Sequence, residues 1–263
     1  MSNQSAKAQT FRSLHVPGRP LVLFNVWDAG SAKAVAASGA RALATGSWSV
    51  AAAHGFTDGE RMPFDLSLAN LHRIVGATDL PVTIDLESGY GADPAAVRET
   101  VTRALRAGGV GFNIEDSLPE NGSLRAASAQ AARLKAARAA ADALGVSAFL
   151  NARTDVFFQT KPEHHDVGMI EAALERGRLY AEAGADGLFV PGLADERLID
   201  RLVEGSPLPV NIMVGERTPP AARLGDLGVA RISHGPGPYL LVMRALENAA
   251  RAALEGASAS PRH

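Results

Sequence analysis

Short apolar runs alternate with longer stretches rich in Ala and Leu that carry charges on one face, and the alternation occurs eight times along the chain. A short apolar run is typical of a buried parallel strand, and the amphipathic stretches are typical of helices. Eight strands that alternate with helices imply parallel strands joined by right-handed crossovers, which close into a (β/α)8 TIM barrel of the α/β class. The predicted strands span residues 21–27, 41–45, 82–86, 109–114, 147–152, 187–190, 210–214 and 230–233, and the predicted helices span residues 31–38, 66–75, 94–107, 126–144, 168–183, 195–203, 219–227 and 239–254.

Glycine supports these boundaries, because Gly39, Gly108 and Gly184 each follow a predicted helix directly before the next strand. Glycine is common just after the last helical residue. The pattern predicts a single barrel domain over residues 1–263, with a core at about 11–254. The two ends are small and polar, and we expect them to be flexible. A doubly wound open sheet is the structural alternative.

Composition narrows the class of protein. The 263 residues are enough for one large barrel, and a formal net charge of −2 gives no basic surface for nucleic acid. No apolar run is long enough to predict a membrane span, and the absence of cysteine excludes disulfides and thiol catalysis. The N-terminal residues lack the apolar core of a signal peptide, so we expect a cytoplasmic protein.

The predicted third strand ends in two acids. Val82, Thr83 and Ile84 form a β-branched run that is followed by Asp85 and, two residues later, by Glu87. A strand's period of two points both carboxylates to the same side. Such a pair at the end of a buried strand indicates a site for a hard cation such as Mg²⁺. The alternative is that Asp85 caps the following helix or turn.

Polar residues also follow the other predicted strands. The active site of a barrel enzyme lies at the carboxyl ends of its strands, so these side chains should converge there. Buried charges at one rim need partners or a ligand. The residues at the strand ends are Asn25, Trp27 and Asp28; Thr45, Gly46, Ser47 and Trp48; Asp85 and Glu87; Asn113, Glu115 and Asp116; Asn151, Arg153 and Asp155; Pro191; Asn211; and Ser233 and His234.

Arg153 and His234 each allow two interpretations. Arg153 can pair structurally with Glu115 or Asp85, or it can bind a substrate carboxylate with its two-pronged guanidinium. A lone histidine such as His234 is more often a hydrogen-bonded structural residue than a catalyst. Both roles stay open for each residue.

Four further polar residues are interpreted as structural. For Asp116 and Asp155 we favour the role of helix caps, because Asp is common at helix starts. His164 and His165 lie in a polar loop, and we expect them to face solvent.

Several ordered segments together resemble the isocitrate lyase and phosphoenolpyruvate mutase superfamily. The resemblance runs over roughly residues 11–254. Its segments are the TGSW turn with Asp58 downstream, IDLESGYG, NIEDS, NARTD and GADGLFVPG. Each is short, and the combination in this order is what makes the resemblance specific.

The resemblance implies a Mg²⁺-dependent enzyme, with Mn²⁺ as a substitute, that acts on a small 2-oxo or 2-hydroxy acid through an enolate. Asp85 matches the direct metal ligand of the superfamily. Asp58, Glu87 and Glu115 match the acids that hold the metal through water, and Asp58 is also a candidate base. Many members carry Asp where Glu87 stands.

The resemblance also implies how a carboxylic acid substrate is held. Arg153 matches the arginine that steadies its oxygens, and the turn at Gly46, Ser47 and Trp48 matches the one whose amides hold its carboxylate. We add Asn211, at the end of strand seven, as a binding residue. Superfamily members often exchange their last helix between subunits, so we expect a homo-oligomer, either dimer or tetramer, in which helix 239–254 packs on a neighbour.

The loop after the fourth strand departs from two branches of the superfamily. The lyases carry a Lys-Arg/Lys-Cys-Gly-His motif there, whereas this loop, residues 117–124, has no cysteine. Isocitrate or methylisocitrate cleavage by that mechanism is therefore disfavoured. The phosphonate branch has Pro-Lys-x-Asn/Thr-Ser-Leu; Pro119, Ser123 and Leu124 fit, but Glu120 replaces the lysine and should repel a phosphonate.

Decarboxylation of a 2-oxo acid such as oxaloacetate fits these departures best. Mg²⁺ and Arg153 would stabilise the enolate, and His234 is a candidate proton donor to it. The alternatives are a phosphonopyruvate-type mutase or hydrolase, a methylisocitrate lyase-like enzyme, and a barrel that binds a carboxylate without catalysis. The last is disfavoured because an unfilled charged cluster costs folding free energy.

Overall fold

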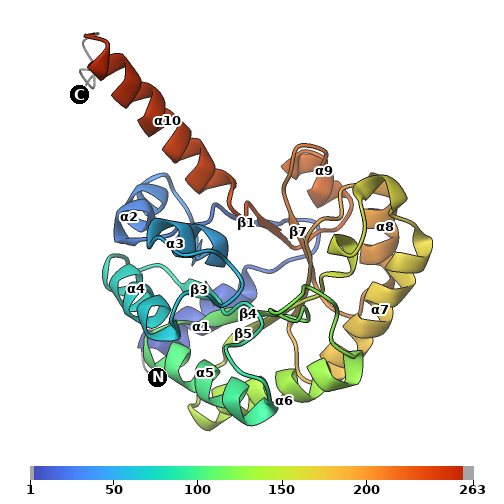
Figure 1. The fold of residues 1–263 in the computed structure, drawn as a ribbon. Helices are drawn as coiled ribbons and strands as arrows, with labels where there is room; N and C mark the ends of the chain where they lie inside the picture. The colour runs from blue at the N-terminus through green and yellow to red at the C-terminus, as the bar shows by residue number, and fades with distance from the viewer. Residues whose placement is uncertain (1–2, 257–263) are drawn as a thin grey trace.

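The computed structural model describes residues 3–256 and shows a barrel of parallel strands surrounded by helices (Figure 1). Within these residues eight strands pair in the order β1-β8-β7-β6-β5-β4-β3-β2. A parallel bridge between Val26 and Thr45 joins the β1 and β2 ends, so the fold is the predicted (β/α)8 barrel and not the open doubly wound sheet. The strands are β1 (Leu21–Leu23), β2 (Leu43–Ala44), β3 (Val82–Asp85), β4 (Gly111–Glu115), β5 (Phe149–Arg153), β6 (Gly187–Val190), β7 (Val210–Met213) and β8 (Arg231–Ser233).

Helices follow the strands and cover the outside of the barrel. Their apolar faces pack on outward strand residues such as Leu188 and Ile212, both fully buried. The helices are α1 (Asn3–Ser13), α2 (Ala29–Ala37), α3 (Ser47–Ala53), α4 (Phe64–Gly76), α5 (Pro94–Arg106), α6 (Ala127–Ala143), α7 (Val167–Glu182), α8 (Glu196–Gly205), α9 (Ala221–Asp226) and α10 (Gly237–Leu254), with short 3-10 turns η1 (Val156–Phe158) and η2 (Pro162–His164). No helix of the described residues is long and apolar enough to span a membrane.

The N-terminal segment is a helix, so the prediction of a flexible end there is wrong. Helix α1 inserts Ala8 and Phe11, both fully buried, at the end of the barrel where β4 and β5 begin. The Gln4 side chain donates to the carbonyls of Leu105 and Gly109 at 2.6 and 2.8 Å. This polar segment is therefore ordered by the burial of the Phe11 ring and by the hydrogen bonds of the Gln4 side chain. The predicted flexible C-terminal end lies mostly outside the described residues.

Helix α10 has a different position from the other helices, because it extends away from the barrel (Figure 1). Its buried residue is Pro238, at its start. Within residues 3–256 no helix covers the outer face of β1, where Val22 is 44% exposed and Phe24, just after the strand, is 39% exposed.

The barrel interior is unusually polar near the carboxyl ends of its strands. Asp85 pairs in register with Asn113, and Asn113 pairs with Asn151 on the next strand. These inward-facing residues lie above Phe149, at the start of β5, and below the loops that follow the strands. The polar layer forms the floor of the candidate site.

Candidate active site

A cavity of about 190 Å³ opens at the carboxyl ends of the strands. Two acids and a guanidinium form part of its wall, together with amides and several large apolar side chains. Its lining residues are Asn25, Gly46, Ser47, Trp48, Asp58, Asp85, Asn113, Arg153, Phe158, Phe189, Met213, Ser233, Gly235 and Pro236. The predicted binding turn, Gly46 to Trp48, and the predicted Asp58, Asp85 and Arg153 are thus brought together here.

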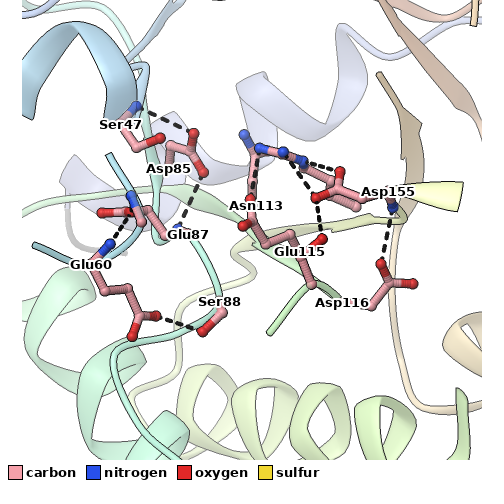
Figure 2. Close-up of polar contacts among 12 residues, drawn as sticks. Ser47, Glu60, Asp85, Glu87, Ser88, Asn113, Glu115, Asp116 and Asp155 are labelled. Atoms are coloured by element: carbon pink, nitrogen blue, oxygen red, sulfur yellow. Dashed lines mark hydrogen bonds and ion pairs between the residues drawn. The ribbon is translucent and has the colours of Figure 1, made fainter. Parts of the chain in front are cut away.

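Asp85 ends β3 and presents its carboxylate to the cavity. One oxygen accepts from the backbone N–H of Ser47, at the first turn of α3, and the other from that of Glu87, both at 3.3 Å (Figure 2). The turn-capping interpretation of Asp85 is therefore correct in part, although helix α5 is capped by Asp93. Both hydrogen bonds are long, so the carboxylate keeps acceptor capacity for a ligand.

Asp58 lines the same cavity as Asp85. Burial raises the pKa of Asp58, and the charge of Asp85 raises it further. Two carboxylates at one wall, one of which disfavours the ionisation of the other, indicate a place where a cation is stabilised.

Glu87 does not line this cavity; it anchors the neighbouring loop. Its carboxylate accepts from the N–H of Gly59 at 2.8 Å, from the N–H of Glu60 and from the Tyr90 hydroxyl. Glu60 in turn accepts from the Ser88 hydroxyl and the Tyr90 N–H, both at 2.7 Å. Burial raises the pKa of Glu87 to about 7. Glu87 thus fixes the loop that carries Asp58, and its oxygens are already engaged by donors of the chain.

Arg153 lies between two carboxylates. Its Nη1 contacts Glu115 Oε2 at 2.7 Å, and its Nε and Nη2 donate to the two oxygens of Asp155 at 2.6 and 3.0 Å (Figure 2). Burial alone would lower the pKa of Arg153, but Glu115 and Asp155 raise it. Burial raises the pKa of Glu115 despite this partner. The predicted pairing with Glu115 is confirmed, and the guanidinium also lines the cavity.

Asp116 caps no helix, and Asp155 stands at the N-cap position of η1 without a capping hydrogen bond from its side chain, so the predicted capping role is wrong for Asp116 and holds for Asp155 in position only. Asp116 is fully buried and accepts from the Asp155 N–H at 2.9 Å, the Tyr180 hydroxyl at 2.7 Å and Arg176 Nη1 at 3.0 Å. Asp155 forms an ion pair with Arg153 and also accepts a hydrogen bond from the Ser117 hydroxyl at 2.6 Å. The carboxylates of both acids are fully engaged in contacts that join the ends of β4 and β5 to each other and to helix α7. These partners are distant in the sequence, so the residues next to each acid do not predict them.

Four predicted site residues lie away from the cavity lining: Glu87, which anchors the loop, Glu115, which pairs with Arg153, and also Asn211 and His234. Asn211 is buried and exchanges 3.2 Å hydrogen bonds with Ser233, which itself lines the cavity. The backbone N–H of His234 donates to Asn25 Oδ1 at 2.9 Å, and the His234 ring lies 5.0 Å from that of Phe24 on the outer side of β1. The structure thus places Asn211 beneath the site and the His234 ring beside it.

The two loop histidines differ. His164 is exposed, as predicted, whereas His165 packs its ring edge-on against Phe157 and bonds the Phe157 carbonyl through Nε2 at 2.9 Å. The expectation that His165 faces solvent is therefore wrong.

Several cavity residues had no assigned role in the sequence. Asn25, Asn113 and Ser233 were recognised only as polar residues at strand ends. The sequence does not indicate that Phe158 and Met213 line the cavity, because an apolar residue beside a site follows the same hydrophobic pattern as one in the core. The Arg153 guanidinium lies over the face of the Phe158 ring, 5.7 Å from the ring centroid.

No three His, Cys, Asp or Glu side chains between residues 3 and 256 converge as a ready-made metal cage. Mg²⁺ is commonly held by one or two carboxylates, with water and substrate oxygens completing its octahedron. Asp85, supported by Asp58, provides such a donor set at the cavity wall. The residues present therefore fit a divalent cation that shares its coordination with the substrate.

Comparison with known proteins gives a consistent picture. The family model described as phosphoenolpyruvate phosphomutase matches residues 11–254. A crystal structure of a proposed phosphonomutase from Burkholderia cenocepacia J2315 is 57% identical, with a TM-score of 0.92, and the match covers 96% of this chain and 99% of that one.

Two curated enzymes are more distant relatives. Oxaloacetate decarboxylase of Bradyrhizobium sp. (strain ORS 278) is 30% identical over 195 residues, which cover 72% of this chain and 64% of the enzyme. 2-Methylisocitrate lyase of Salmonella typhimurium (strain LT2) is 27% identical over 205 residues, which cover 77% of this chain and 68% of the enzyme.

Proposed function

The chain belongs to the phosphoenolpyruvate phosphomutase family, within the superfamily that includes the isocitrate lyases, and from this premise we propose that it is a Mg²⁺-dependent lyase that decarboxylates a small 2-oxo acid. Oxaloacetate is the first candidate substrate. The similarity to an oxaloacetate decarboxylase agrees with this choice.

The observation that carries the proposal is the chemistry of the cavity wall. Among the described residues that line it there are two acids and one arginine, but no Cys, Lys or His. Cleavage of a 2-hydroxy acid requires a base to remove the hydroxyl proton. Decarboxylation of a 2-oxo acid requires none, because the departing CO₂ leaves its electron pair in an enolate that positive charge must stabilise. The two acids of the wall are the ones that would hold the cation, and no Cys, Lys or His of the lining is left to act as the base, so the wall favours the second reaction.

The residues of this chain would divide the work as follows. The N–H groups of the Gly46 to Trp48 turn, at the start of α3, would orient the substrate carboxylate. Asp85, with Asp58, would hold Mg²⁺, which supplies Lewis-acid polarisation of the 2-oxo group when bound. Arg153 would bind the developing enolate oxygen, and Glu115 and Asp155 hold its guanidinium in place before the reaction.

Proton delivery to the enolate carbon falls to water or to Asp58, the titratable group beside Asp85 at the wall. His234 is not assigned this step in the proposal, because its ring lies outside the lining.

A phosphonopyruvate-type reaction is the second candidate, since the structure at 57% identity is described as a proposed phosphonomutase. Glu120 speaks against it. Glu120 borders a hollow together with Glu60 and Arg61, and it places a carboxylate where the phosphonate branch has a lysine.

The test is pyruvate release from oxaloacetate with Mg²⁺, with Mn²⁺ and with EDTA, after subtraction of the metal-catalysed background. Wild type should show metal-dependent turnover that Asp85→Ala abolishes. Asp65→Ala, which removes an exposed acid on α4, is the control and should retain activity. Release at background level, with turnover of a 2-alkylmalate, 2-methylisocitrate or phosphonopyruvate instead, would contradict the choice of reaction. Absence of turnover with every substrate tested would favour a binding protein without catalytic activity.

A further inference from the structure

Arg231 is a buried cation that makes no ion pair, although the charge of Asp85 opposes the effect of burial on its pKa. It begins β8 inside the barrel, is 1% exposed, and no Asp or Glu of the described residues lies within ion-pair distance. Its Nε and Nη1 have no hydrogen-bond partner among those residues. The ring of Phe11, on α1, lies 6.0 Å from the guanidinium. A charge in this state costs folding free energy, so its presence calls for a compensating role.

The contact that Arg231 does make leads to the cavity floor. Its Nη2 lies 3.5 Å from Oδ1 of Asn113, and Asn151 Nδ2 donates to the same oxygen at 2.9 Å. Asn113 lines the cavity, whereas Arg231 does not. Arg231 therefore lies beneath the floor and acts on it through one amide.

This contact determines which end of the Asn113 amide faces the cavity. A guanidinium is a donor only, so the atom that faces Arg231 must be the amide oxygen. The Nδ2 group is left for the cavity side, and it donates to none of the described residues. Asn113 thus presents an N–H donor from the floor, in register beside Asp85 on β3.

We propose that Arg231 is a positioning residue for the anion site: it orients Asn113 so that Nδ2 donates to a ligand oxygen, and it supplies positive charge beneath that oxygen. The inference rests on the proposed function, in which the ligand is a 2-oxo acid that becomes an enolate. A 2-oxo carboxylate and its enolate both place anionic oxygens over such a donor, and the charge beneath the floor favours the enolate more strongly as its charge develops.

The physical consequence is a conflict between folding and binding. Removal of the Arg231 charge should relieve a folding cost and weaken anion binding in the same protein. A residue with a purely structural role would instead lose stability when it is replaced.

The experiment measures oxalate binding by calorimetry with the full-length protein and Mg²⁺, because oxalate is a planar dianion that resembles the enolate of pyruvate. Arg231→Met and Asn113→Ala should each weaken binding about tenfold or more, as expected for a charge-assisted hydrogen bond. The double variant should bind no more weakly than the weaker single variant, because both changes remove the same interaction. Arg231→Lys, which keeps a donor and the charge, should recover most of the affinity.

Thermal unfolding of the same proteins separates the structural alternative. The Tm of Arg231→Met should be unchanged or higher. Asn113→Asp gives Arg231 an acid partner and replaces the donor with an acceptor, so its Tm should rise while oxalate binding is lost.

Three outcomes would overturn the inference: wild-type affinity in Arg231→Met, a lower Tm in that variant, or additive losses in the double variant. Failure of the wild type to bind oxalate with Mg²⁺ would instead count against the proposed function.

Discussion

Asp155 determines where the Arg153 guanidinium lies. It takes two of the arginine's donors and accepts from the Ser117 hydroxyl, so that the loop after β4 and the arginine of β5 share one carboxylate. An arginine that must meet developing charge gains from being fixed before the reaction, because a small misplacement can cost about 100-fold in rate.

Asp155→Asn should therefore impair catalysis more than stability. The amide keeps the shape of the side chain, but it turns one acceptor into a donor that repels the guanidinium. We expect kcat/KM for the accepted substrate to fall by roughly 100-fold, mainly through kcat. Steady-state kinetics check this, with Asp166→Asn, at the exposed start of α7, as a control that should retain activity because Asn caps helices as well as Asp. An unchanged kcat would show that Glu115 alone positions Arg153.

Asp116 contributes to stability, because its buried carboxylate holds Arg176, Tyr180 and the backbone of Asp155 together. Its replacement by Ala leaves Arg176 without its acid and frees the Asp155 N–H and the Tyr180 hydroxyl. Because breaking a buried pair strands a charge, Asp116→Ala should lower the free energy of unfolding by about 3–5 kcal/mol. Urea denaturation measures this. Asp65→Ala breaks the exposed pair with Arg103 and should cost less than about 1 kcal/mol; equal losses in the two variants would contradict the assignment.

At the residue scale, the sequence predicts those site residues whose position follows from the residues next to them in the chain. Asp85 follows a β-branched run, and the parallel register of β4 and β5 places Glu115 beside Arg153, as expected. The same reasoning fails for Asp116, because its partner Tyr180 is 64 residues away and on a helix. It also fails for Glu87, whose side chain turns to the loop at Gly59 because its backbone is left-handed, with φ of 50°.

At the scale of elements, the alternation of apolar runs and amphipathic stretches was sufficient for the strands and most helices, whereas α1 and α3 were missed. Helix α3 has only seven residues and its N-cap is Gly46, which has no side chain to cap it, so the sequence carries neither an amphipathic repeat nor a capping signal there. Helix α1 depends on tertiary contacts. Phe11 meets the Phe149 ring edge-on, and His15 stacks on the same ring with the two centroids 3.8 Å apart.

His15 makes this end of the barrel sensitive to acid. Burial lowers its pKa from 6.5 to about 3, and the charge of Arg231 contributes. Between these values the unfolded chain binds a proton that the folded chain does not, so stability falls as pH decreases from about 6.5. The slope approaches about 1.4 kcal/mol per pH unit for a single proton.

His15→Phe should remove this dependence, since the ring still stacks on Phe149 but cannot titrate. Urea denaturation from pH 7.5 to pH 5 should show that the free energy of unfolding of the variant increases relative to that of wild type at each step toward lower pH. The loss of the hydrogen bond between Nδ1 and the Phe11 carbonyl adds an offset that does not change with pH. A constant difference between the two proteins across this range would refute the assignment.

At the scale of the whole molecule, two apolar surfaces are left uncovered. Helix α10 projects from the barrel (Figure 1). Its Leu240, Leu241, Val242 and Leu246 are exposed, as are Val22 and Phe24 on the outer side of β1. A groove of Pro20, Leu21, Val22, Phe24, Val35, Ser38, Gly39, Ala40 and Arg41 lies over β1. Exposed apolar patches of this kind are typical of interaction surfaces.

The two surfaces fit one explanation, which is that α10 of one subunit packs on the barrel of another, as the family resemblance led us to expect. A last helix that covered its own barrel would bury β1, whereas this one points away from it. Wild type should therefore be a dimer or tetramer by light scattering after size exclusion. Leu241→Glu and Leu246→Glu should shift it toward monomer and lower its Tm, because each places a charge in an apolar contact. Arg251→Gln changes the charge by the same amount on the polar face of the same helix, where Arg251 pairs with Glu247, and it should leave the oligomer intact. A wild type that is monomeric at all concentrations would mean that neither surface is an interface between copies.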